Sequence, residues 1–366
     1  MKELFLHIGT QKTGTTSIQS FLRLNKLKLS SNQIYSPISL DIGNGHHRWI
    51  TLLASDIDKS DSFSLNLEFK STKEKRIKIE QKLASFNKEV ESKTHGKWII
   101  SCEHLQSELT SQSDILKLKN ILVNLFDKVT VILYIRNPLD TVISLWSTQT
   151  KYGAKLTRIS KPNNKFYENV VNHKNTIIRW ESVFGRENLK VCRFQKKDFI
   201  KNNLIEDFCS KVEIEFDDTY KKPPLANKSL SLIGMKSLGY INNFIPHFEK
   251  QKSKSLQLIR NRERDNIASY IEEYTSKDIP YIASKDEAKE YDEYYKESNE
   301  WVRKEFFNED KELWEITNKY LDFDNQEIMK LTRSEQMLCN LIIKLWKEKQ
   351  QFNKKINENK NIEIRL

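Results

Sequence analysis

Short runs of apolar, β-branched and aromatic residues recur along the first 200 positions of the chain. Four of them, at 4–8, 97–102, 129–135 and 189–194, have the length of buried strands and are bounded by polar or turn-forming residues. A weaker run at 33–38 indicates a fifth strand. The pattern therefore predicts a sheet of four or five strands in the N-terminal half.

Amphipathic patterns separate these runs. Apolar residues over 15–29 and over 113–126 recur at spacings of three and four, which indicates helices with one buried face. Asn137 and Pro138 are residue types favoured at the start of a helix, and Gly185 is typical of a helix end. Strands that alternate with helices predict an α/β fold with a P-loop-type parallel sheet flanked by helices.

Two longer stretches lack strong strand patterns. Residues 40–96 and 215–325 are polar, charged and mostly helical in character. We interpret them as helical insertions or packed-on helices within one α/β domain that covers residues 1–325. Residues 326–366 then form a C-terminal helical extension.

The extension has an apolar repeat of seven residues. The repeat consists of Leu331, Leu338, Leu345 and Phe352. Such spacing suits a coiled coil or a docking helix, so a homo-oligomer formed through this helix is one possible arrangement. Because the repeat covers few heptads, an ordinary amphipathic terminal helix is the favoured interpretation.

Composition adds an expectation about ligands. The 366 residues have a formal net charge of +11 and a pI near 9.2, which predicts attraction to an anion such as a phosphorylated cofactor, an acidic polysaccharide or nucleic acid. The four cysteines form no CxxC pair, and no apolar run approaches the roughly 18 residues of a membrane span. We therefore expect a reduced, cytoplasmic protein without a membrane span.

A polar loop, "GTQKTGTTS", follows the first predicted strand and opens the first predicted helix. In this setting backbone N–H groups meet an anion at the helix N-terminus. The loop adds an amide, a lysine and hydroxyl groups to the binding set. The candidate binding residues are Gln11, Lys12, Thr13, Gly14, Thr15, Thr16 and Ser17.

The loop differs from the Walker A sequence of P-loop NTPases. Walker A has a lysine directly after its second glycine, where this chain has Thr15, and its only loop lysine is Lys12. Thr16 still matches the magnesium-binding hydroxyl. A deviant P-loop NTPase or small-molecule kinase is therefore the alternative enzyme hypothesis, although a shorter anionic group fits the loop better.

A second candidate anion site follows the strand at 129–135. Arg136 ends that strand, where α/β sheets bind ligands, and Ser144 lies about two turns along the next helix. A guanidinium and a hydroxyl suit a separate phosphate.

Together, "QKTGTTS" and "IRNPLDTVIS" resemble the corresponding segments of PAPS-dependent sulfotransferases, and "SCEHL" and "SNEWVRKEFF" are similar to bacterial carbohydrate sulfotransferases. The resemblance implies that the first loop binds the 5′-phosphosulfate of PAPS and that Arg136 and Ser144 bind its 3′-phosphate. It further implies transfer of a sulfuryl group to a hydroxyl or amine of a carbohydrate, such as a bacterial polysaccharide or its precursor.

Such transfer needs charge stabilisation, for which Lys12 is the candidate, and a general base. Glu103 and His104 follow the strand at 97–102, and the resemblance slightly favours Glu103. His47, in the glycine-rich segment "GNGHHRW", is the third candidate base. No metal is required, and the adjacent pair His46–His47 lacks metal-ligand spacing. A nucleic-acid-binding protein is the non-enzymatic alternative, but no motif supports it, so nucleic acid is not an expected partner.

Overall fold

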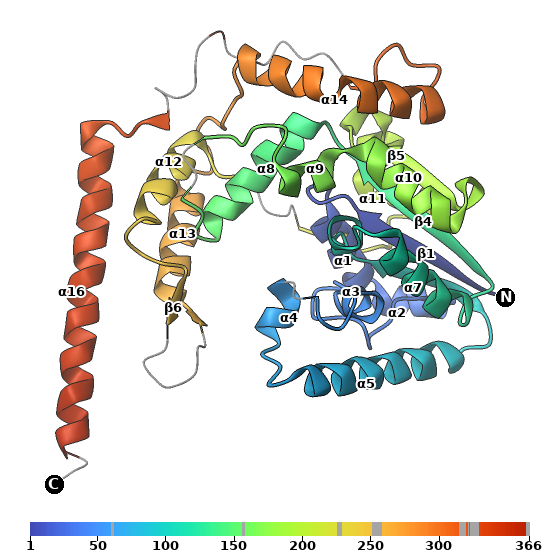
Figure 1. Ribbon diagram of the computed structural model, residues 1–366, viewed down its shortest axis with the longest axis horizontal. Helices are drawn as coiled ribbons and strands as arrows, with labels where there is room; N and C mark the ends of the chain where they lie inside the picture. The colour runs from blue at the N-terminus through green and yellow to red at the C-terminus, as the bar shows by residue number, and fades with distance from the viewer. Residues whose placement is uncertain are drawn as a thin grey trace. The chain divides into compact units, whose positions relative to one another are not determined.

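A computed structural model of the chain describes residues 1–59, 62–155, 158–224, 229–250, 258–314, 320, 322 and 329–363 (Figure 1). Its contacts divide it into two compact units. The first comprises Met1–Thr141, Pro162–Asn227 and Tyr291–Ile316, and the second comprises Val142–Lys161, Lys228–Glu290 and Thr317–Leu366. The predicted boundary between residues 325 and 326 lies outside the described residues.

The first unit is built on a five-stranded sheet. Its strands are β1 (Lys2–Gly9), β2 (Ile34–Tyr35), β3 (Gly96–Ser101), β4 (Lys128–Ile135) and β5 (Leu189–Arg193). Their order is β2-β3-β1-β4-β5, and every neighbouring pair is parallel. All five strands match a predicted run, so the α/β class with a parallel sheet is confirmed.

Side-chain alternation along the strands creates two separate cores. On β1, Leu4, Leu6 and Ile8 belong to one apolar cluster, whereas Phe5 belongs to the other. The first cluster includes residues of α7 (Gln112–Val123) and α10 (His173–Phe184), and the second includes residues of α1 (Thr15–Leu24) and α11 (Leu204–Lys211). Helices thus cover both faces, which is why the strands are almost continuously apolar. Each large side chain buried in this way contributes roughly 1.5–3 kcal/mol.

The helices follow their sequence signals closely. α7 and α10 match the predicted helices, and α10 ends at Gly185, which has a positive φ of 87°. The helix α8 (Pro138–Lys151) begins at Pro138, and the side-chain oxygen of Asn137 accepts a hydrogen bond from the Asp140 N–H at 3.3 Å.

The helix predicted over 15–29 is two helices in the structure. It ends at Leu24 as α1 and resumes as α2 (Lys26–Ser31). The break lies at Asn25, whose side-chain amide donates to the carbonyl of Phe21 and to that of Lys221, both at 2.9 Å. Asparagine competes with the backbone for such bonds, and this interrupts the predicted helix.

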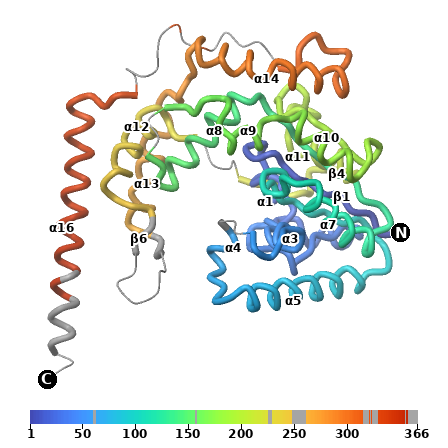
Figure 2. The backbone as a smooth tube through the Cα atoms, in the orientation of Figure 1, coloured from blue at the N-terminus to red at the C-terminus, as the bar shows by residue number. Residues whose placement is uncertain are grey.

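The first helical insertion lies between β2 and β3. It contains α3 (Trp49–Ala54), α4 (Ser62–Asn66) and the long helix α5 (Thr72–Glu91), whose path Figure 2 shows in blue. Two short helices, α6 (His104–Glu108) and α9 (Lys165–Val171), also belong to the first unit. The helix α14 (Lys285–Phe306) begins in the second unit and ends in the first.

The second unit is mainly helical. It contains α12 (Leu232–Ile241), α13 (Arg262–Tyr274), α16 (Arg333–Glu363) and a short antiparallel pair, β6 (Phe248–Lys250) and β7 (Leu258–Arg260). The strand pattern of the sequence did not predict this pair, because each strand has only three residues. Arg264 is fully buried and donates to the Thr150 carbonyl at 2.8 Å and to the Asn242 side-chain oxygen at 2.6 Å. It thereby satisfies carbonyls at the end of α8.

The C-terminal helix has two apolar sides. Cys339 and Ile343 are buried in a cluster with Ile241 and Ile245, against which Leu331 is partly buried. The other three residues of the seven-residue repeat, Leu338, Leu345 and Phe352, are 56%, 56% and 63% exposed. Within the described ranges, no helix combines the length and the apolar character needed to cross a membrane.

Candidate functional site

Three polar segments meet at the carboxyl edge of the sheet. Because β1 pairs in parallel with both β3 and β4, the ends of these strands lie at one edge. The loop Thr10–Gly14 follows β1, Glu103 follows β3, and Arg136 follows β4 directly. This edge is where open parallel sheets bind ligands.

The loop after β1 is held by bonds of its own. The Thr10 N–H donates to the carbonyl of Tyr134 at 2.7 Å, and the Thr13 hydroxyl donates to the carbonyl of Thr10 at 2.7 Å. Gly14 has a φ of 73°, and a side chain there would begin 2.2 Å from Cδ2 of Leu204. The positive φ therefore favours glycine at this position, and an added side chain would also displace the terminal methyl of Leu204.

The loop delivers the chain into the N-terminus of α1. Gly14 is the N-cap, its carbonyl accepts from the N–H groups of Ser17 and Ile18, and the first turn contains no acidic residue. The N–H groups of Thr15 and Thr16 have no acceptor within the helix, as in any first helical turn. These groups and the positive end of the helix dipole suit an anion. Gln11 is turned toward α6, where its side-chain amide donates to the Ser107 hydroxyl at 2.9 Å.

Arg136 lies against the same loop. Its Nη1 donates to the carbonyl of Lys12 at 3.0 Å, and its guanidinium carbon lies 5.7 Å from the centre of the Phe194 ring. Burial lowers the pKa of the Arg136 guanidinium, and Asp140 opposes this effect. The side chain of Arg136 thus contacts the backbone of Lys12, the other cation predicted to bind a phosphate. Ser144 is buried on α8, in the second unit.

Two of the three candidate bases, Glu103 and His104, form a cluster with His46 that the sequence did not show. His46 Nε2 lies 3.6 Å from Glu103 Oε2, and the rings of His46 and His104 stack with centroids 5.5 Å apart. Gln19, on α1, donates from Nε2 to Glu103 Oε2 at 2.9 Å. Gly9 brings the first loop against this cluster, since a side chain on Gly9 would begin 3.0 Å from the Glu103 Cα.

The charges within the cluster are unequal. Burial raises the pKa of Glu103, but His46, His104 and the hydrogen bond from Gln19 outweigh it, so that the pKa lies below its ordinary 4.5. Burial lowers the pKa of His46 below 6.5, against the opposing charge of Glu103. At neutral pH the carboxylate is therefore charged and His46 is largely neutral. The Cys102 thiol beside them is buried, which raises its pKa to about 12 and keeps it protonated.

His104 is held by a second carboxylate. Its Nδ1 lies 3.1 Å from Glu108 Oε1, and the same oxygen accepts a hydrogen bond from the buried Arg48. Burial raises the pKa of Glu108, but His104 and Arg48 have the larger, opposite effect, and the pKa is lowered to about 2. Glu108 therefore stays ionised and fixes the orientation of the His104 ring.

His47 is placed differently from the other two candidate bases. It is 1% exposed, its Nδ1 accepts from the Ser101 N–H at 3.0 Å, and its Nε2 lies 3.0 Å from the Ser36 hydroxyl. Burial lowers its pKa to about 4. These bonds attach the segment before α3 to the end of β3, and so present the neighbouring His46 to Glu103.

The sequence pattern did not indicate Gln19, His46, Arg48 or Glu108 as site residues. The pattern over 15–29 orients the apolar face of α1 but assigns no role to a polar residue such as Gln19, and α6, which carries Glu108, has only five residues. The one available signal for His46 was its place in the pair His46–His47, and that pair does not show which ring faces Glu103.

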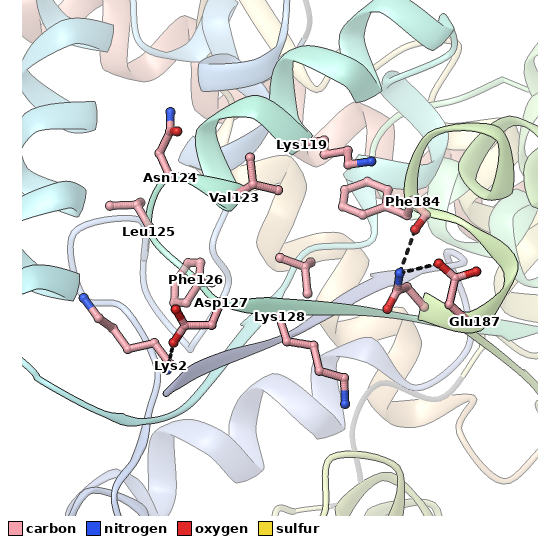
Figure 3. Close-up of a pocket in the computed structure, with 12 residues that line it drawn as sticks. Lys2, Lys119, Val123, Asn124, Leu125, Phe126, Asp127, Lys128, Phe184 and Glu187 are labelled. Atoms are coloured by element: carbon pink, nitrogen blue, oxygen red, sulfur yellow. Dashed lines mark hydrogen bonds between the residues drawn. The ribbon is translucent and has the colours of Figure 1, made fainter.

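A hollow of about 570 Å³ lies at the opposite edge of the sheet. It is lined by residues at the starts of β1 and β4, including Lys2, Asp127 and Lys128, together with Asn188 (Figure 3). The Lys2 N–H donates to Asp127 Oδ2 at 2.6 Å, and Asn188 donates to the Phe184 carbonyl at 2.9 Å. The amino ends of parallel strands are not where such sheets bind ligands, so this hollow is separate from the candidate site.

Comparison with known families identifies one match that includes the site. Residues 3–186, half of the chain, match the sulfotransferase domain family, and this range contains the loop after β1, Glu103, His104, Arg136 and Ser144. No match is found among curated proteins.

Two solved structures show distant likeness. The crystal structure of a sulfotransferase from Alicyclobacillus acidocaldarius is 14% identical and covers 65% of this chain and 91% of its own, with a TM-score of 0.36. The sulfotransferase domain from the curacin biosynthetic pathway is 12% identical and covers 76% of this chain and 98% of its own, also with a TM-score of 0.36. Sequence identity and structural similarity are low in both cases, so the assignment of the chain to a family rests on the family match alone.

The glycine at the loop's end gives a prediction about stability. Gly14→Ala should lower the free energy of unfolding by about 1–2 kcal/mol because of its positive φ, and by up to about 1 kcal/mol more because the terminal methyl of Leu204 must move aside. Gly43→Ala is the matched control, because Gly43 has a φ of 112° and no atom within 4 Å of an added Cβ. Urea unfolding of both variants measures the difference.

The contact itself is tested by adding Leu204→Ala to Gly14→Ala. The double variant should be more stable than the sum of the two single effects predicts, by about 0.5 kcal/mol or more. Strict additivity would contradict close packing between Gly14 and Leu204.

Proposed function

The chain belongs to the sulfotransferase domain family and is an enzyme of sulfuryl transfer, and from this premise we propose that its donor is PAPS and its acceptor a carbohydrate. The single observation that supports the donor most directly is the loop after β1. It joins a helix N-terminus without acidic residues to Lys12 and, through the Lys12 carbonyl, to Arg136.

The proposed donor site has two anion-binding parts. The N–H groups of Thr15 and Thr16, with Lys12, would bind the 5′-phosphosulfate, and Arg136 would bind the 3′-phosphate. Thr13 shapes the loop through its bond to Thr10, and Gln11 fixes the loop to α6 through Ser107. When bound, PAPS supplies the sulfuryl group. Ser144, in the second unit, stays a prediction from the sequence for the 3′-phosphate.

The acceptor hydroxyl must lose a proton, and Glu103 is the base that we propose. Its carboxylate is ionised at neutral pH, and Gln19 orients Oε2. His46 and His104 lie beside this carboxylate. Their ring nitrogens can therefore share a proton that Glu103 takes up at Oε2. Lys12 is proposed to offset negative charge that develops on the leaving phosphate oxygen. The net charge of +11 is compatible with an acidic glycan as acceptor, such as a bacterial polysaccharide or its precursor.

The nucleotide preference can be measured by calorimetry without metal ions. We expect adenosine 3′,5′-bisphosphate to bind at least about tenfold more tightly than ADP or ATP. Only the bisphosphate has a phosphate at both the 5′ and the 3′ position, whereas ADP and ATP have phosphates at the 5′ position alone. Arg136→Ala should remove most of this preference, whereas Lys12→Ala should weaken the binding of all three ligands.

Arg158→Ala is the control, since it removes one cation outside the proposed phosphate sites. Equal affinity of the wild type for the bisphosphate and ADP would contradict a PAPS site. Tighter binding of ATP that required magnesium would instead support a kinase or NTPase.

The base is tested by Glu103→Gln, measured as transfer from labelled PAPS to a glycan that the wild type accepts. Loss of general-base catalysis should lower kcat by about 10²–10⁴-fold, while affinity for the bisphosphate changes little. All rates are measured in chelator-treated protein. Glu91→Gln, which removes an exposed carboxylate from α5, should retain the wild-type rate. A fully active Glu103→Gln would assign the role to His104 instead.

The exposed repeat on α16 supports a proposal about partners: two copies of the chain associate through this helix. Leu338, Leu345 and Phe352 lie outside the apolar cluster that α16 shares with α12. A seven-residue apolar repeat is complementary to a second identical repeat, and pairing would bury these side chains.

Light scattering during gel filtration should therefore give the mass of a dimer. Leu345→Lys should shift it to the monomer, because pairing would bury the new charge. Asn353→Lys, which adds the same charge at an exposed position beside the repeat, should remain dimeric. A wild-type chain that is monomeric at micromolar concentration would contradict the proposal.

A further inference from the structure

The cluster beside the phosphate loop has the composition of a metal site. His46, Glu103 and His104 each offer one ligand atom, and these three atoms lie within 4.8 Å of one another. Their side chains are 18%, 17% and 26% exposed, so the group is accessible to a small ion from solvent. Two imidazoles and one carboxylate are a common ligand set for zinc, in which the fourth position stays open.

The distances are close to those that zinc requires. Bonds of about 2.1 Å in a tetrahedron place neighbouring ligand atoms about 3.4 Å apart. His46 Nε2 and Glu103 Oε2 are already 3.6 Å apart. The other two separations between ligand atoms are at most 4.8 Å. They therefore exceed the tetrahedral value by about 1.4 Å or less, a difference that side-chain rotation can remove.

Residues outside the cluster orient its members as they would around a metal. Glu108 Oε1 lies 3.1 Å from His104 Nδ1, which leaves His104 Nε2 as the ligand atom. This carboxylate–histidine pair is the arrangement that fixes the ring of a metal-bound histidine. Gln19 donates to Glu103 Oε2 at 2.9 Å and restrains the carboxylate in the same way.

We propose that His46, Glu103 and His104 bind a zinc ion, and that this ion inhibits sulfuryl transfer. The inhibitory part rests on the proposed function, in which Glu103 is the base. A carboxylate that ligates zinc is a weaker base, because the ion shares its negative charge, so metal binding at Glu103 opposes base catalysis by the same residue. Zinc is favoured over magnesium or calcium because those ions prefer oxygen ligands throughout.

Binding is tested without any activity measurement. Chelator-treated full-length protein is titrated with Co²⁺, whose visible absorption reports tetrahedral coordination, and Zn²⁺ is then used to displace it. We expect one ion per chain. His46→Ala and His104→Ala should each weaken binding by more than about 100-fold, and Gln19→Ala by about 10-fold.

His95→Ala is the matched control, because His95 is exposed and outside the cluster. It should bind cobalt as the wild type does. Retained affinity for adenosine 3′,5′-bisphosphate in His46→Ala shows that this variant is folded. Equal cobalt binding by His46→Ala and wild type, or a sulfur-to-cobalt charge-transfer band, would overturn the site.

Inhibition is a separate measurement. Zinc should reduce the wild-type rate, a chelator should restore it, and the inhibitory concentration should rise more than about 100-fold in His46→Ala, relative to its own metal-free rate. Zinc that binds at the cluster without reducing the rate would overturn the inhibitory part. If no transfer is detected in any variant, the proposed function fails, while the cobalt titration still decides the metal site.

Discussion

The parallel pairing of β1 with β3 on one side and β4 on the other is the constraint on which the site depends. The register places His7 beside Ser101, and Gly9 beside Leu133. The loop after β1, the carboxylate after β3 and the guanidinium after β4 therefore emerge at one edge, although more than 120 residues separate the first from the last. A slip of one residue in a strand would exchange the two cores that its alternating side chains fill, so packing of the sheet fixes the position of the chemistry.

The edge also brings opposite charges close together. The loop offers N–H groups and cations to an anion, yet Glu103 approaches the same loop so closely that Gly9 has no space for a side chain without movement. A carboxylate in that position would repel an anionic donor if it were free to turn toward it. Gln19 restrains the carboxylate by a hydrogen bond, and His46 and His104 lower its pKa. In the proposed mechanism these contacts allow an anion site and a proton-accepting carboxylate to be neighbours.

The sequence predicted the features that depend on local patterns. Continuous apolar runs identified the buried strands, the two glycines identified the loop, and "IRNP" identified the strand end at Arg136. It did not predict the break at Asn25, because that break depends on a contact with Lys221, 196 residues away. Nor did it show that His46 faces Glu103 while His47 is buried. Adjacent residues on an irregular segment point in directions that only the tertiary contacts with Ser101 and Ser36 determine.

The same physical difficulty explains why metal ligands were not visible in the sequence. Spacing rules for zinc sites describe ligands that share one helix or one loop, as in most short motifs. Here one ligand comes from the segment before α3 and two follow β3, and the residues that orient them lie on α1 and α6. What groups these atoms is the attachment of the segment before α3 to the end of β3, made by His47 and not by any ligand. The buried His47 thereby helps determine which side chains reach the carboxyl edge of the sheet.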